Sequence, residues 1–201
     1  MHSCEIIQNT FEKWHTDKAR HKSYARVYSD IFNQLEPKRI LEFGVWKGQS
    51  LNVWSELFPK AEVVGVDWVD PTRYCDNSCG LLYTHTPKTD NCWPCSNVFF
   101  SKNVKVIVGD LRNIAPQDID PDNKKFDLII DDAGHELDQY DSTLLYLKIL
   151  REQGFFVVED VSPNLIDTLK KLVPSNYKCT HYLNFQTGVE DECMMVIHEK
   201  Y

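Results

Sequence analysis

The sequence has no long hydrophobic run. No apolar stretch in its 201 residues approaches the roughly 18 to 20 residues that span a membrane. Residues 1–13 lack the apolar core of a signal peptide. Internal repeats and low-complexity tracts are absent as well. We therefore expect no membrane contact, and the cytoplasm is the expected compartment.

Positive charge is scarce. The chain has 22 lysines and arginines against 30 aspartates and glutamates, a net charge of −8, and no basic block offsets it. Proteins that bind nucleic acid neutralise phosphates with basic side chains, so a nucleic-acid partner is disfavoured. Hydrophobic residues make up 42% and charged residues 26%, which is typical of a globular protein. The length predicts a single domain over residues 1–201 with room for a small insertion.

Short apolar segments alternate with segments of helical periodicity. Strands are predicted over residues 39–43, 62–67, 104–108, 126–130 and 155–158, and a terminal antiparallel hairpin over 177–185 and 193–198. Helices are predicted over residues 24–35, 49–58, 136–151 and 164–172, with Gly154 following the third. The first four strands are expected to be buried on both faces. This order indicates an α/β protein with a mainly parallel sheet covered by helices.

A glycine loop follows the first predicted strand. Gly44 and Gly48 lie between that strand and a helix, where glycine lets the backbone approach a ligand at the helix N-terminus. Asp67 ends the next strand, about twenty residues later, where an acidic side chain accepts hydrogen bonds from ribose hydroxyls. The pair predicts a nucleoside-containing cofactor.

Trp46 decides which cofactor is expected. A dinucleotide-binding loop needs glycine at this third place, and an indole would crowd a pyrophosphate. S-adenosylmethionine (SAM) has no phosphate. The sequence here resembles class I methyltransferases, in which an acidic residue opens the loop and an antiparallel seventh strand closes a Rossmann-like sheet. The matching positions are Glu42, Gly44, Gly48 and Asp67. The resemblance implies that Asp110 contacts the adenine amino group; a turn or helix-cap role is the alternative.

Carboxylates follow two strands. Asp131 and Asp132 end the fourth predicted strand, Glu159 and Asp160 end the fifth, and both pairs are expected at one edge of the sheet. Such crowding is costly unless a cation neutralises it, and an all-oxygen set suits Mg²⁺. His135 follows closely and is suited to act as a general base near neutral pH. In the alternative interpretation these carboxylates cap helices and His135 is a surface residue.

Residues 129–135 and 154–160 resemble the metal-dependent O-methyltransferases of the macrolide-sugar and cephalosporin-hydroxylase-like group. The stretch Thr16-Asp17-Lys18, Tyr24 after it, and the loop through Ser50 are similar to the same group. The resemblance implies Mg²⁺ ligands at Asp132, Glu159 and Asp160, and a base at His135 that deprotonates a sugar hydroxyl. Its cofactor-binding positions are Lys18, Tyr24, Glu42, Gly44, Gly48, Ser50, Asp67 and Asp110.

These features predict a SAM- and Mg²⁺-dependent O-methyltransferase that acts on a small-molecule hydroxyl, expected on a sugar or small glycoside. Related enzymes often form homo-oligomers. One alternative is an RNA cap ribose 2′-O-methyltransferase, in which Lys18 and Asp132 begin a Lys-Asp-Lys-Glu set. The acidic charge, and Glu159 where that set needs a lysine, disfavour it. A catalytically silent binding module is the other alternative.

Residues 70–100 delay the third strand and hold four of the seven cysteines. Cys75, Cys79, Cys92 and Cys95 form two close pairs, which is typical of a tetrahedral Zn²⁺ site. A structural Zn²⁺ would stabilise an insertion that has little apolar content. Two disulfides and unligated thiols are the alternatives.

Overall fold

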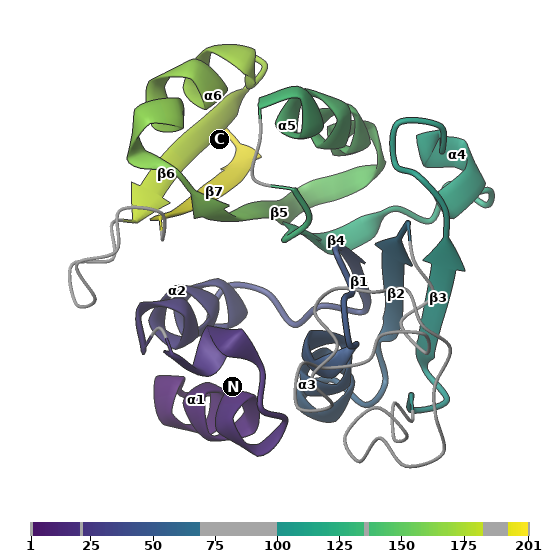
Figure 1. Cartoon of the computed structure of the whole chain (residues 1–201), viewed down its shortest axis with the longest axis vertical. Helices are drawn as coiled ribbons and strands as arrows, with labels where there is room; N and C mark the ends of the chain where they lie inside the picture. The colour runs from purple at the N-terminus through teal and green to yellow at the C-terminus, as the bar shows by residue number, and fades with distance from the viewer. Residues whose placement is uncertain (1, 21, 69–99, 135–136, 183–192, 201) are drawn as a thin grey trace, which may run out of the picture.

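The computed structural model describes residues 2–20, 22–68, 100–134, 137–182 and 193–200. Its centre is a seven-stranded sheet in the order β3-β2-β1-β4-β5-β7-β6 (Figure 1). The strands are β1 (Arg39–Phe43), β2 (Glu62–Asp67), β3 (Val104–Val108), β4 (Phe126–Asp131), β5 (Leu150–Val161), β6 (Tyr177–Tyr182) and β7 (Cys193–Glu199). The first five run parallel, and β7 is antiparallel to both β5 and β6. The predicted α/β class and the antiparallel end of the sheet are confirmed.

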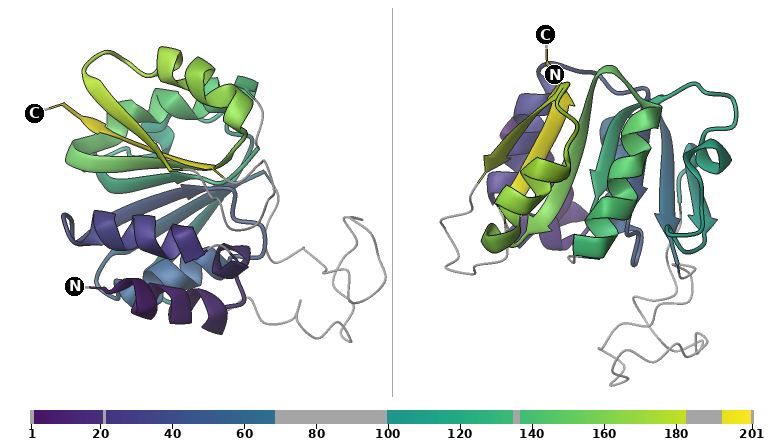
Figure 2. Two further views of the ribbon diagram at one scale, coloured as in Figure 1. Left: turned by 90° about the vertical axis from the view of Figure 1, so that its left-hand side faces the viewer. Right: turned by 90° about the horizontal axis from the view of Figure 1, so that it is seen from above.

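Helices cover both faces of the sheet (Figure 2). One layer contains α1 (Cys4–Lys13), a 3-10 helix (Asp17–Arg20), α2 (Lys22–Phe32) and α3 (Gln49–Leu57). The other contains α4 (Pro116–Ile119), α5 (Leu137–Leu144), two 3-10 helices (Leu145–Ile149 and Pro163–Leu165) and α6 (Ile166–Leu172). No helix within the described ranges is long and apolar enough to cross a membrane.

Side chains that alternate along the central strands divide the core into two parts. Leu128 and Ile130 of β4 pack with the layer of α1, α2 and α3, whereas Ile129 packs with the layer of α5 and α6. All three are fully buried. Successive strand residues face opposite sides, so a continuous apolar strand supplies both cores.

The first helix was not predicted from the sequence. Ser3 caps α1, because its Oγ accepts a hydrogen bond from the Ile6 backbone N–H at 3.3 Å. Ile7 and Phe11, one helical turn apart, are fully buried against α2 and α3. The cap and this spacing are the signals that could have identified the helix.

Two sequence predictions are wrong in detail. The helix expected over residues 136–151 becomes a 3-10 helix after Leu144 and ends at Ile149, and Gly154 lies inside β5 rather than after a helix. Leu150 already pairs with Phe126 of β4, so the chain satisfies its hydrogen bonds in the sheet. β3 is half-exposed rather than buried on both faces, because it is an edge strand.

Gly44 brings the loop after β1 against the end of β4. Its φ is +83°, and a Cβ there would lie 2.0 Å from the backbone oxygen of Asp132. We expect Gly44→Ala to destabilise the fold by about 3 kcal/mol or more, since left-handed strain adds to a clash with backbone. Gly109→Ala is the control, because its Cβ would meet only the end of the Ile114 side chain. Equal losses in chemical denaturation would contradict the prediction.

Candidate functional site

A cavity of about 690 Å³ lies at the carboxyl ends of the parallel strands. This is the edge where ligands bind to sheets of this kind. Six of the sequence-predicted site residues line it: Gly44, Ser50, Asp67, Asp110, Asp132 and Asp160. The structure therefore brings together much of the predicted cofactor site and two of the three predicted Mg²⁺ ligands.

Asp67 holds the glycine loop in place. Its Oδ2 accepts hydrogen bonds from the backbone N–H groups of Val45 and Trp46, each at 2.8 Å. The side chain is buried at the end of β2, beside the loop that follows β1. Asp67, which is predicted to accept hydrogen bonds from ribose hydroxyls, therefore also fixes the loop beside the cavity through one of its carboxylate oxygens.

The loop keeps a left-handed backbone at its middle residue. Gly44, Trp46 and Gly48 have φ of 83°, 45° and 75°. A residue with a side chain adopts this conformation at a cost, and such strain concentrates at functional sites. The Trp46 indole is 46% exposed, lines the cavity and lies 4.3 Å from the Lys47 Nζ, measured to the ring centroid. The loop thus keeps the backbone geometry of glycine while placing an aromatic ring at the cavity.

Asp110 is paired with Arg112. The Arg112 Nε and Nη2 atoms donate to the Asp110 carboxylate at 3.0 and 2.7 Å, and these hydrogen bonds lower the pKa of Asp110. Both residues line the cavity. The adenine contact of Asp110 stays a prediction, and the structure adds Arg112 as its partner.

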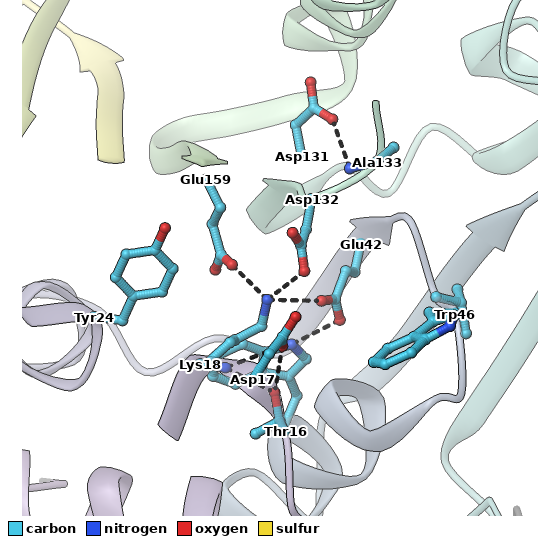
Figure 3. Close-up of polar contacts among 12 residues, drawn as sticks. Thr16, Asp17, Lys18, Tyr24, Glu42, Trp46, Asp131, Asp132, Ala133 and Glu159 are labelled. Carbon is cyan, nitrogen blue, oxygen red and sulfur yellow. Dashed lines mark hydrogen bonds and ion pairs between the residues drawn. The ribbon is translucent and has the colours of Figure 1, made fainter. Parts of the chain in front are cut away.

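A buried acidic cluster lies beside the cavity and consists of Glu42, Asp132 and Glu159 (Figure 3). The Lys18 Nζ is 2.5 Å from Asp132 Oδ2 and 3.7 Å from Glu42 Oε1, and it also donates to Glu159. Lys18 comes from the N-terminal 3-10 helix, and the carboxylates come from β1, β5 and the end of β4. One ammonium group thus joins four segments that are distant in the sequence.

Aromatic side chains donate hydrogen bonds to the second carboxylate oxygens of Glu42 and Glu159, and to Asp160 nearby. Trp54 Nε1 donates to Glu42 Oε2 at 2.8 Å, and the Tyr28 hydroxyl donates to Glu159 Oε1. The Tyr24 hydroxyl donates in the same way to Asp160. Neither Tyr28 nor Trp54 is among the residues predicted for the site, because apolar positions of a helix are typical of core packing. The helical layer of α2 and α3 therefore aims one oxygen of Glu42 and one of Glu159 at Lys18.

Burial controls the electrostatics of the cluster. Desolvation raises the pKa of Glu42 to about 7 and that of Asp132 to about 6, although Lys18 opposes both shifts. The pKa of Glu159 is raised for the same reason. Desolvation would lower the pKa of Lys18, but the surrounding carboxylates outweigh it and raise that pKa well above its usual value. The cluster therefore keeps its cation over the physiological pH range.

The two predicted carboxylate pairs behave differently. Asp131 points away from Lys18 and accepts a hydrogen bond from the Thr143 hydroxyl on the opposite face of the sheet (Figure 3). The expectation that both members of each pair converge is thus wrong for Asp131, because successive strand residues alternate. At Glu159 and Asp160 this alternation is broken by a register shift with β7, where Asp160 has φ 50°. Both side chains therefore serve the site.

Four predicted cofactor residues do not line the cavity. Lys18, Tyr24 and Glu42 belong to the acidic cluster or its support, and Gly48 precedes α3 without lining the cavity. Their part in cofactor binding stays a prediction. Asp132 is shared, because it contacts Lys18 and also lines the cavity.

Two predicted features fall outside the described residues. They are the proposed base His135 and the zinc ligands Cys75, Cys79, Cys92 and Cys95 with most of the 70–100 insertion. Within the part of the chain that is described, no group of three or more His, Cys, Asp or Glu side chains is arranged to hold a metal ion. The hard oxygens of Asp132 and Glu159 do suit Mg²⁺ and already aim at one point, but the Lys18 ammonium stands there.

Comparison with known proteins gives the class. Residues 41–161, more than half of the chain, match a family model described as a methyltransferase domain, so the chain belongs to this methyltransferase family. No curated protein matches the sequence.

Solved structures share the fold at low sequence identity. The MycE methyltransferase of the mycinamycin biosynthetic pathway, in complex with Mg and SAH, superposes with a TM-score of 0.57 at 19% identity. The match covers 96% of this chain and 48% of MycE, so this chain spans about half of that protein. Fibrillarin of Methanococcus jannaschii has a TM-score of 0.56 at 16% identity, over 86% of this chain and 74% of that one. The Podospora anserina methyltransferase PaMTH1, bound to SAH, has a TM-score of 0.53 at 16% identity, and the match covers 97% of this chain and 88% of PaMTH1. The chain therefore belongs to a methyltransferase-domain family and shares its fold with these three proteins.

The strained loop gives a test of the site geometry. We expect Trp46→Gly to be more stable than Trp46→Ala by about 1 kcal/mol, because only glycine adopts the left-handed conformation without strain. Both variants remove the indole and its contact with Lys47, so the difference isolates the backbone effect. Urea denaturation measures it. An alanine variant as stable as the glycine variant would show that the loop is unstrained.

Proposed function

We propose that the protein transfers the methyl group of SAM to a hydroxyl oxygen, on a sugar or small glycoside, with Mg²⁺ as a second cofactor. The observation that carries the proposal is the position of Asp132 and Asp160. Both carboxylates line the cavity, next to the glycine loop at Gly44. A volume of about 690 Å³ lies within the usual range for small-molecule sites.

The reaction needs a positioned donor and a deprotonated acceptor. The hydroxyl oxygen attacks the methyl carbon in line with the carbon–sulfur bond, which breaks as S-adenosylhomocysteine leaves. Asp67 and the loop it fixes support the cofactor side of the cavity. Asp132 and Asp160 can accept hydrogen bonds from acceptor hydroxyls on the other side.

We assign the hydroxyl proton to His135, the third residue after Asp132. An imidazole is suited to accept a proton near neutral pH. Mg²⁺ would be held by Asp132, Glu159 and Asp160, and when bound it lowers the pKa of a coordinated hydroxyl. These roles extend the resemblance to the macrolide-sugar group, and MycE, a structural neighbour, was crystallised with Mg, SAH and mycinamycin VI.

A ribose 2′-hydroxyl of RNA is the second candidate acceptor. The contact of Lys18 with Asp132 at 2.5 Å is the observation that favours it, since these two residues begin the Lys-Asp-Lys-Glu set. Glu159 stands in the same contact where that set requires a lysine, and the net charge is −8. A small-molecule acceptor therefore remains our proposal.

His135→Ala should retain SAM binding and lose about 10²- to 10⁴-fold in turnover, because only proton removal is affected. Calorimetry measures SAM binding. Mass spectrometry measures turnover as methyl transfer to a panel of glycosides and to capped RNA. His181→Ala, an exposed histidine on β6, is the matched control and should leave both unchanged.

Three outcomes would contradict parts of this proposal. Full turnover by His135→Ala would remove the base assignment. Methylation of capped RNA alone would favour the second candidate. A wild-type chain that fails to bind SAM would instead be a silent binding module.

A further inference from the structure

Lys18 occupies the point at which the free oxygens of Asp132 and Glu159 converge. We propose that Lys18 is a built-in competitor of the divalent cation: its ammonium group fills the cation position, and a metal ion binds the two carboxylates only when this side chain leaves. The inference rests on the proposed function, which supplies the divalent ion. It concerns how readily the site exchanges one cation for another.

The geometry makes the two cations mutually exclusive. The Lys18 ammonium donates to one oxygen of Asp132, at 2.5 Å, and to one of Glu159. The other oxygen of Glu159 is held by Tyr28, and Trp54 holds the second oxygen of the neighbouring Glu42. Mg²⁺ approaches carboxylate oxygens to about 2.0–2.1 Å. An ion bound by the same two oxygens would therefore overlap the ammonium.

Charge explains why a cation must always be present. The side chains of Glu42 and Glu159 are 0% and 1% exposed, and that of Lys18 is 1% exposed. Removing one partner from such a buried group leaves charges with no compensation, which is strongly destabilising. Lys18 supplies the positive charge of the cluster in the metal-free protein and holds one oxygen of Asp132 and one of Glu159 toward one point. A divalent ion would restore that balance with twice the charge.

The displaced side chain has a favourable place to go. Thr16 and Asp17, the two residues before Lys18, line the cavity, and Asp17 is not one of the proposed metal ligands. The backbone N–H of Lys18 is bonded to Asp17 Oδ1 at 3.0 Å and to Thr16 Oγ1 at 3.3 Å, so the main chain can stay in place. The ammonium would leave the cluster for the side of the cavity that carries the exposed Asp17 carboxylate.

Competition weakens the apparent affinity for the metal, because only the fraction of molecules with Lys18 displaced can bind it. Manganese replaces magnesium as the probe, since bound and free Mn²⁺ differ in paramagnetic resonance. Wild type, Lys18→Met, Lys18→Gln and the control Lys13→Met are titrated with Mn²⁺ at fixed ionic strength. Lys13 pairs with Glu56 at the surface and lies outside the cluster.

We expect both Lys18 variants to bind Mn²⁺ about tenfold or more tightly than wild type, a change of about 1.4 kcal/mol, and Lys13→Met to match wild type. Mn²⁺ should raise the melting temperature of the Lys18 variants far more than that of wild type. If Lys18→Met does not fold without metal, Lys18→Gln still carries amide donors for the carboxylates. Equal or weaker binding by the Lys18 variants, or no binding by any protein, would overturn the inference.

A failure of the proposed function can be distinguished from a failure of the proposed competition between Lys18 and the metal ion. Methyl transfer by wild type, measured in the same preparations, reports the function and not the competition. Tighter Mn²⁺ binding by the Lys18 variants without any methyl transfer would support the inference and count against the function. Methyl transfer by wild type, together with equal Mn²⁺ affinity in wild type and the Lys18 variants, would support the function and overturn the inference.

Discussion

The structure depends on three buried carboxylates that share one ammonium group. Glu42, Asp132 and Glu159 cannot be charged in a dry interior without a cation among them, and Lys18 supplies it. Because Lys18 belongs to the N-terminal layer and the carboxylates belong to three strands or their ends, this interaction fixes that layer over the sheet. Tyr28 of α2 and Trp54 of α3 complete it by donating to the second oxygens of Glu159 and Glu42.

The cavity and the cluster meet at Asp132. On one side lies the glycine loop, held by the Asp67 carboxylate and strained at Trp46. On the other lie the acidic ends of β4 and β5, where the bulge at Asp160 turns two successive carboxylates toward the site. A methyl donor on the first side and a hydroxyl on the second would be neighbours. This division supports the proposed transfer reaction.

Membership of a methyltransferase-domain family and the shared fold support the donor side of the proposed chemistry. The acceptor side is built from residues in loops, which vary freely on a common fold. The chain spans 48% of MycE, so the acceptor of that protein does not carry over with the fold.

The sequence alone determined the α/β class, the strand order along the chain and the glycine loop with Asp67, because each depends on local periodicity or on residues a short distance apart. It also placed Asp132, Glu159 and Asp160 at strand ends. It could not reveal that β5 begins as early as Leu150, since pairing of Leu150 with Phe126 is a long-range interaction. Nor could it assign Asp131 to the opposite face or give Tyr28 and Trp54 a polar role. Only the tertiary structure decided that Lys18 stands among the carboxylates, because that contact joins residues 114 and 141 positions apart.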